Sequence, residues 1–152
     1  MVENISLVAH SAIRIVNQNE KVIYFDPFTI KGKYENDADI IFITHSHYDH
    51  FSPEDINDIR KINTKIVATE DLYDKIISLN IKKENILLVE PNKKYEIEGI
   101  EFETIPAYNL NKEFHKREYN WVGYLVKIDN KIMYIAGDTD NTKEAQKVKC
   151  NI

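Results

Sequence analysis

The first third of the chain alternates between short apolar runs and short polar segments. Short runs rich in β-branched residues and bounded by polar turns are typical of strands. The polar segment 17–20 suits a turn between two of these runs. The pattern therefore predicts strands over residues 5–8, 13–16, 22–25 and 40–43.

Two helices are predicted in the middle of the chain, separated by a strand over residues 65–68. The first has Ser52 as its N-cap and Pro53 at its first helical position. Thr69 is the candidate N-cap of the second. Apolar residues at helical spacing are expected to face the core, namely Ile56, Ile59 and Ile62 in the first helix and Leu72, Ile76 and Leu79 in the second.

The second half of the chain is predicted to be mainly strands, with one more helix starting near Thr142. Two of its strands form a hairpin about the turn 129–130. Mixed strands and helices with prominent hairpins indicate an α+β fold rather than a doubly wound parallel sheet. The strands of this second half are expected over residues 86–89, 95–97, 100–105, 121–128 and 131–136.

The chain shows no linker or repeat, so it is predicted to be one domain over residues 1–152.

Composition and charge exclude several classes of partner. A formal net charge of −5 with scattered basic residues argues against nucleic acid as the partner. No apolar stretch approaches the roughly 20 residues that span a bilayer, so no membrane partner is expected. The single cysteine, Cys150, fits a reducing compartment, and the N-terminal residues lack the pattern of a signal peptide. We therefore expect a cytoplasmic protein.

The most informative segment is residues 44–50, which follows the apolar run 40–43. It contains three of the five histidines, His45, His47 and His50, together with an aspartate. Imidazole and carboxylate groups that converge at the end of a buried strand are typical ligands of Zn²⁺ and similar cations. The alternative is a solvated loop that happens to be rich in histidine.

The spacing of these residues indicates how metals would be shared. On an extended backbone His45 and His47 project from one face, so they can bind the same ion. Asp49 and His50 lie further along the chain and can serve a second ion. Asp138 follows the last predicted strand, where a carboxylate could bridge two cations, although a glycine–aspartate–threonine sequence alone is more often a plain turn.

The sequence THSHYDH at residues 44–50, followed by GDT at residues 137–139, resembles the metallo-β-lactamase superfamily. Residues 10–15 and 24–28 are similar to its branch of small hydrolases near the ascorbate-phosphate lactonases. The order of elements agrees over essentially the whole chain. The resemblance implies a four-layer αββα sandwich, with helices outside two mixed β-sheets and metals at one sheet edge.

The resemblance also implies a set of ligands and an activity. It assigns His45 and His47 to the first metal, Asp49 and His50 to the second, and Asp138 to the bridge between them. One or two Zn²⁺ ions are expected, and other divalent metals remain open. The implied reaction is hydrolysis of a small ester, lactone or phosphoester by a metal-bound hydroxide. Asp49 is the candidate catalytic residue, because a positioned carboxylate can relay a proton to the leaving group.

Iron-based oxygen chemistry is not expected. Relatives that carry it out replace the second histidine of the motif with a carboxylate, whereas this chain has His47. The superfamily fold hosts several kinds of hydrolysis, so the fold does not choose the substrate.

Further residues have two readings each. His10 is either a substrate-binding residue near the metals or a strand histidine satisfied by backbone. Asp26 either orients a ligand histidine, as carboxylates beside metal sites often do, or belongs to a turn. The loop 106–120 is either the wall of a substrate site, with aromatic and cationic side chains, or a plain surface loop with Trp121 and Tyr124 in the core.

Two departures from the family pattern put a complete site in question. Asn109 stands where the third histidine of the first metal site is expected, and an asparagine is a poor zinc ligand. Asn109 or His115 could complete that site, both could contact substrate, or His115 could be a surface histidine. The C-terminal strands and helix of the family are expected to be missing, either in a fragment or in a natural short form. A second subunit could cover the edge left open, which is compatible with a homo-oligomer, and a non-catalytic metal-binding module is the rival interpretation.

Overall fold

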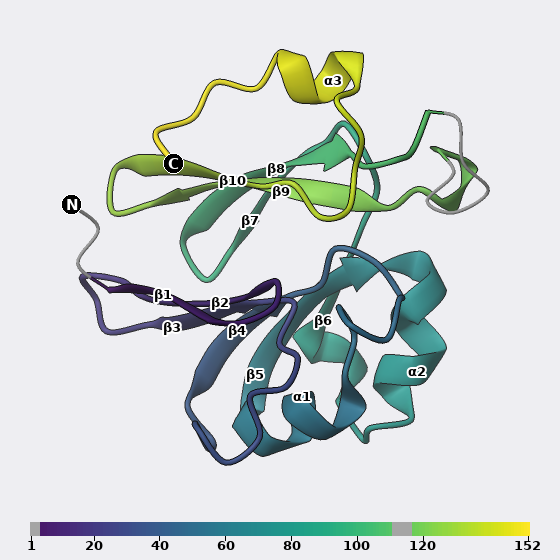
Figure 1. Cartoon of the computed structure of the whole chain (residues 1–152). Helices are drawn as coiled ribbons and strands as arrows, with labels where there is room; N and C mark the ends of the chain where they lie inside the picture. Colours follow the sequence, from purple (N-terminus) through teal and green to yellow (C-terminus); the bar gives the residue numbers. More distant parts are fainter. Residues whose placement is uncertain (1–3, 111–116) are drawn as a thin grey trace. The chain divides into compact units, whose positions relative to one another are not determined.

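The computed structural model of the chain describes residues 4–110 and 117–152. It divides into two compact units, the first ending at Leu88 and the second running from Val89 to Ile152. Each unit combines one β-sheet with short helices (Figure 1). The candidate metal ligands of residues 44–50 belong to the first unit, and Asp138 belongs to the second.

The first unit is built on a mixed six-stranded sheet with strands in the order of the sequence. The first three strands pair antiparallel, whereas the third, fourth and fifth pair parallel to one another. The strands are β1 (Ile5–Ala9), β2 (Ala12–Val16), β3 (Val22–Phe25), β4 (Ala38–Phe42), β5 (Arg60–Thr69) and β6 (Ile86–Val89).

The parallel strands β3 and β4 form the centre of this unit. Residues 23–25 and 40–42 are completely buried, as expected for continuous apolar runs in central strands. Phe25 lies opposite Phe42 in the register, and their rings stack with centroids 4.8 Å apart. Because the two strands are parallel neighbours, the residues that follow Phe25 and Phe42 leave the sheet at the same edge.

Helix α1 (Pro53–Ile59) begins where the sequence predicts but ends earlier than the apolar spacing suggests. The hydroxyl of Ser52 accepts a hydrogen bond from the Asp55 amide, as an N-cap should. The backbone becomes extended at Arg60, where β5 starts at once. Ile62 therefore lies in a strand with 75% of its surface exposed, and the prediction that it faces the core from the helix is wrong.

The second predicted helix consists of two short pieces, the 3₁₀ turn η1 (Glu70–Leu72) and α2 (Tyr73–Ile77). Thr69 donates a hydrogen bond to the Asp71 carboxylate rather than capping a backbone amide. Leu72 and Ile76 are buried as predicted, whereas Leu79 lies beyond the helix and is half-buried against the core. A second 3₁₀ turn, η2 (Lys83–Asn85), leads into β6. In Figure 1, α1 and α2 lie on one face of the six-stranded sheet.

The second unit contains a four-stranded sheet of order β10-β9-β8-β7. Every pairing in it is antiparallel. The prediction of two mixed sheets is therefore confirmed for the six-stranded sheet and wrong for this one. The predicted hairpin turn forms, with positive φ at both Asp129 and Asn130. The elements are β7 (Lys94–Ile97), β8 (Ile100–Pro106), η3 (Arg117–Tyr119), β9 (Val122–Ile128), β10 (Lys131–Ile135) and α3 (Lys143–Gln146).

Gly123 marks a close approach of two segments in this unit. A Cβ atom at Gly123 would lie 2.8 Å from the carbonyl oxygens of both Ile135 and Ala136. The absence of a side chain therefore lets the end of β10 approach β9. Gly137 follows with a φ of 65°, a conformation that glycine adopts without steric cost. These two glycines set the path of the chain into Asp138.

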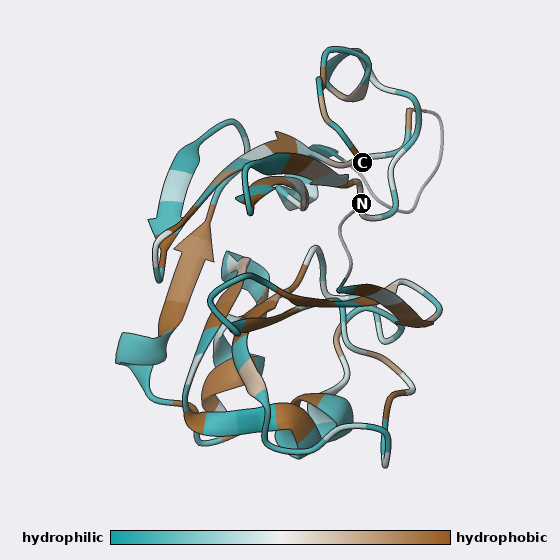
Figure 2. Cartoon of the chain, turned by 90° about the vertical axis from the view of Figure 1, so that its left-hand side faces the viewer, coloured by the Kyte–Doolittle hydropathy of each residue, from teal (hydrophilic) through white to brown (hydrophobic). Residues whose placement is uncertain are grey.

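Hydropathy follows the architecture of each unit. Strands are coloured mostly as hydrophobic in Figure 2, whereas loops and the outward sides of helices are mostly hydrophilic. This is the distribution expected when sheets supply the core and one side of each helix contacts water. In the described part of the chain, no helix has the length and apolar character needed to cross a membrane.

Candidate metal site

The histidine-rich segment begins where β4 leaves the sheet. The amide of Ile43 still donates to the carbonyl of Val67 in β5, at 2.8 Å, so the backbone is anchored just before the first histidine. A tight turn follows, in which the carbonyl of His47 accepts hydrogen bonds from the amides of His50, at 3.0 Å, and Phe51, at 2.8 Å. The turn brings the His50 ring back to within 4.1 Å of the His45 ring, centroid to centroid.

The structure brings the four predicted ligands of this segment together. His45 and His47 offer ligand atoms within 4.8 Å of each other, and so do Asp49 and His50. The Nε2 atom of His50 lies 3.7 Å from an oxygen of Asp49. His45 and His50 are buried, whereas His47 and Asp49 are half-buried. Buried ligands beside more accessible ones suit a site that is held rigidly yet open to a small molecule.

Asp26 is a buried carboxylate at the base of this cluster. It follows β3 directly, with a φ of 45°, and its amide donates to the carbonyl of Phe42. One carboxylate oxygen accepts from the amide of Thr44 at 2.8 Å. The other is 2.7 Å from the Thr44 hydroxyl and 2.8 Å from Nδ1 of His50. Of the two readings of Asp26, the structure supports the one in which it orients a histidine.

With the Asp26 carboxyl ionised, one set of proton positions on the two imidazoles satisfies these hydrogen bonds. His50 donates its Nδ1–H to the Asp26 carboxylate. The Thr44 hydroxyl gives its single proton to Asp26, so its oxygen accepts from Nδ1–H of His45 at 2.8 Å. Both histidines then carry the proton on Nδ1, and each presents Nε2 as the basic nitrogen. A partner on the far nitrogen is the usual arrangement of a metal-binding histidine.

The electrostatics of Asp26 depend on this cluster. Burial raises the pKa of the Asp26 carboxyl, and the hydrogen bonds from His50 and Thr44 oppose that shift. A cation held beside His50 would favour the ionised carboxylate in the same way.

In the second unit, Asp138 follows β10 in a loop joined to the chain after β8. The Thr139 hydroxyl accepts from the amide of Tyr108 at 3.0 Å and donates to its carbonyl at 3.1 Å. The amide of Asp140 also donates to that carbonyl at 3.0 Å. These bonds hold the loop that carries Asp138 against the loop that carries Asn109, which is half-buried.

The other residues singled out from the sequence have different positions. His10 lies in the turn between β1 and β2, is exposed, and has its ring 5.3 Å from that of Phe28. His115 lies outside the described residues. Trp121 and Tyr124 are buried, as expected if loop 106–120 is a plain surface loop next to the core.

Sequence reasoning did not assign a role to Thr44, although this residue opens the motif and links Asp26 to His45. Its signal was its position, since it is the last residue before the first candidate ligand. The contact between Phe28 and Tyr48 was also not predicted. Nothing in the local sequence pattern brings these two rings together.

Comparison with known proteins identifies the family. The sequence-family model of the β-lactamase superfamily domain matches residues 4–151, which span both units. The chain belongs to the metallo-β-lactamase superfamily, as the histidine motif and the loop at Asp138 predicted.

Individual relatives agree with this assignment. A UPF0173 metal-dependent hydrolase of Pyrococcus abyssi is 31% identical over 144 residues, covering 89% of this chain and 61% of that protein. A crystal structure of a protein from Parabacteroides distasonis superposes with a TM-score of 0.80 at 28% identity, covering 95% of this chain and 64% of the other. The predicted fold class is confirmed.

A more distant structure shows how little the fold says about chemistry. The diiron β-hydroxylase CmlA from Streptomyces venezuelae superposes with a TM-score of 0.73 at 14% identity, over 91% of this chain and 30% of that one. This likeness concerns the fold alone. The present chain spans about 61% of the length of the curated relatives.

Proposed function

We propose that this chain carries the metal centre of a metal-dependent hydrolase. The observation that carries the proposal is the hydrogen-bonded arrangement of Asp26, Thr44, His45 and His50. It fixes both imidazoles with Nε2 as the basic nitrogen. In a solvated histidine-rich loop, water would satisfy the ring nitrogens and no such fixed orientation would be expected. The name of the Pyrococcus abyssi relative, a metal-dependent hydrolase, supports the same reaction class.

The donor set fits zinc. Imidazole nitrogens with a carboxylate oxygen are common ligands of catalytic Zn²⁺, and they also accept other divalent first-row metals. In this proposal His45 and His47 would hold one ion, and Asp49 and His50 would hold a second. Asp138 would ligate both, a role that rests on the family resemblance.

The chemistry follows from what a divalent cation supplies when bound: it lowers the pKa of a coordinated water to about 7 and polarises the oxygen of a carbonyl or phosphoryl group. The chain's own groups complete the reaction. The Asp49 carboxylate is 39% exposed and can take up a proton and pass it to the leaving group. Asp26 and Thr44 keep two imidazoles in one orientation throughout.

The proposed substrate is a small ester, lactone or phosphoester. His10, Asn109 and His115 are its proposed contacts, and each can donate a hydrogen bond to an oxygen-rich group. Nucleic acid is not proposed as the substrate because the net charge is −5. A cytoplasmic location and self-association remain predictions from the sequence.

A second candidate is a metal-binding module without catalysis. Asn109, in place of the expected third histidine of the first site, is the observation that favours it. With a weaker ligand at that position, one ion would be held less tightly than in a complete site.

Hydrolysis assays decide between the two. The purified chain, freed of metal with a chelator and reloaded with Zn²⁺, Mn²⁺ or Fe²⁺, is tested on 4-nitrophenyl acetate, bis(4-nitrophenyl) phosphate and a γ-lactone. The proposal expects turnover that depends on added metal and is lost in the double variant His45→Ala, His47→Ala. Retained metal with no turnover on any of these substrates would favour the module.

A further inference from the structure

Three aromatic side chains form a row on the surface of the first unit, next to the ligand segment. Tyr48 stands between the ligands His47 and Asp49 in the chain, with 78% of its surface exposed. Its ring packs edge-on against Phe28, with centroids 5.9 Å apart and an interplanar angle of 77°. Phe28 in turn contacts the ring of His10 at 5.3 Å. We call Tyr48, Phe28 and His10 the aromatic row.

The backbone that supports the row has positive φ at three positions, and one of them, Thr29, is in a conformation that is unfavourable for its residue type. Asp26 and Thr29, on the two sides of Phe28, have φ values of 45° and 55°, and His10 has a φ of 46°. A β-branched residue such as Thr29 rarely adopts the left-handed region. Such strain persists only where surrounding contacts enforce it, and it tends to gather at functional sites.

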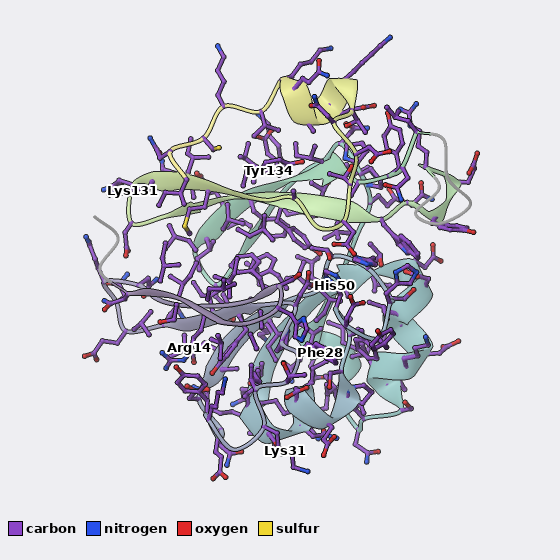
Figure 3. The ribbon with its side chains drawn as sticks, viewed as in Figure 1. Arg14, Phe28, Lys31, His50, Lys131 and Tyr134 are labelled. Carbon is purple, nitrogen blue, oxygen red and sulfur yellow. The ribbon has the colours of Figure 1, made fainter. Side chains whose placement is uncertain are left out.

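Asp55 supplies that enforcement for Phe28. Its buried carboxylate accepts hydrogen bonds from the amides of Thr29, at 3.0 Å, and Ile30, at 2.8 Å. The Ser52 hydroxyl donates to the same carboxylate. The start of α1 thus fixes the segment that presents Phe28, while Asp26 fixes its other end beside His50. Figure 3 labels both Phe28 and His50 in this unit.

The row has the properties of a binding surface for a flat apolar group. Aromatic rings bury a large area against a partner and prefer offset-stacked or edge-to-face contacts. The Tyr48 ring is highly exposed and has an edge-on contact with Phe28, so a flat ligand can bury the rest of the ring against itself. The row also starts within the ligand segment, because Tyr48 stands between His47 and Asp49 in the chain.

We propose that the aromatic row binds an aryl or similarly flat apolar substituent of the substrate, and that it favours aryl esters or aryl phosphoesters over alkyl ones. This inference rests on the proposed function, since it places the reacting group of the same molecule at the metal ligands. It adds Tyr48 and Phe28 to the substrate contacts and gives His10 a stacking role in addition to its hydrogen-bonding capacity.

The test compares the binding of phenylphosphonate and methylphosphonate to the zinc-loaded chain by isothermal titration calorimetry. Both anions can approach the metal ligands, and they differ in the group that would reach the row. We expect phenylphosphonate to bind about five- to tenfold more tightly, as one aromatic contact allows. Tyr48→Ala should reduce this ratio to near one, whereas Tyr48→Phe should keep it, because the ring makes the contact.

Ile62→Ala is the matched control, since Ile62 is a similarly exposed apolar side chain of the same unit at 75%. It should leave the ratio unchanged. A ratio near one in the unaltered chain, or a ratio that survives Tyr48→Ala, would overturn the inference. Zinc content measured on the same samples distinguishes failure of the aromatic-row inference from failure of the proposed function. Zinc retained with no preference for phenylphosphonate rejects the row alone, and failure to hold zinc rejects both the row and the proposed function.

Discussion

The carboxylate of Asp26 lies 2.8 Å from Nδ1 of His50, although 24 positions separate the two residues in the chain. Both are almost completely buried. They meet because β3 and β4 are parallel neighbours, so the residues after both strands leave the sheet at one edge. This pair links the fold to the proposed chemistry, since the carboxylate holds the ring of a proposed metal ligand in one orientation.

Asp26→Asn is expected to weaken zinc binding about 10- to 100-fold, the usual effect of losing a carboxylate behind a ligand histidine. An amide oxygen and an amide NH₂ cannot together accept all the hydrogen bonds now made by Thr44 and His50. Competition with a chromophoric chelator measures the change. Asp37→Asn is the control, because Asp37 precedes β4 at its opposite end and pairs with Arg14. Equal affinities in both variants would contradict the role of Asp26.

Thr44→Val removes the hydroxyl that joins Asp26 to His45 while keeping the shape of the side chain. Two buried groups each lose a hydrogen-bond partner, so the free energy of unfolding should fall by about 1–3 kcal/mol. Urea denaturation of the metal-free chain measures this change. Thr44→Ser restores the hydroxyl and should recover most of the loss. If Thr44→Ser is as unstable as Thr44→Val, the methyl group rather than the hydrogen bonds matters.

Gly123→Ala should destabilise the second unit. Its Cβ would lie 2.8 Å from two backbone carbonyl oxygens, which cannot move away as a flexible side chain could. Overpacking of this kind costs about 1–3 kcal/mol. Urea unfolding followed by the fluorescence of Trp121, which is buried in this unit, reports the effect. Unchanged stability would show that β9 and β10 can separate at this point.

Asp138→Asn tests the predicted bridge. If Asp138 joins two ions, replacing its carboxylate should lower the zinc content by about one ion per chain and leave the ion bound by His45 and His47 weaker but present. Asp140→Asn is the control, because Asp140 lies in the same loop as Asp138 and its carboxylate accepts from the amide of Leu110 in the loop after β8. Equal zinc content in the two variants and the unaltered chain would exclude the bridging role.

Local sequence patterns predicted most of the strands, because alternation and turn residues act over a few positions. They failed for Ile62, since helical spacing continued past the point at which Arg60 becomes extended to start β5. They also left Asp26 undecided between two readings. Its contact with His50 depends on which strands are neighbours, and spacing along the chain does not contain that information.

The same limit applies to the candidate site. His45, His47, Asp49 and His50 could be predicted because they lie within one short segment. The aromatic row could not, since it joins three separate turns that only the sheet brings together. Likewise, Thr44 gains its role from a carboxylate on another strand.

Metal stoichiometry tests the central claim most directly. Plasma mass spectrometry on the purified chain, beside the double variant His45→Ala, His47→Ala, counts the bound transition metals. The proposed centre predicts close to two ions per chain and a marked loss in the variant. Metal content that is negligible in the unaltered chain, or equal in the variant, would contradict the assignment of this segment as a metal site.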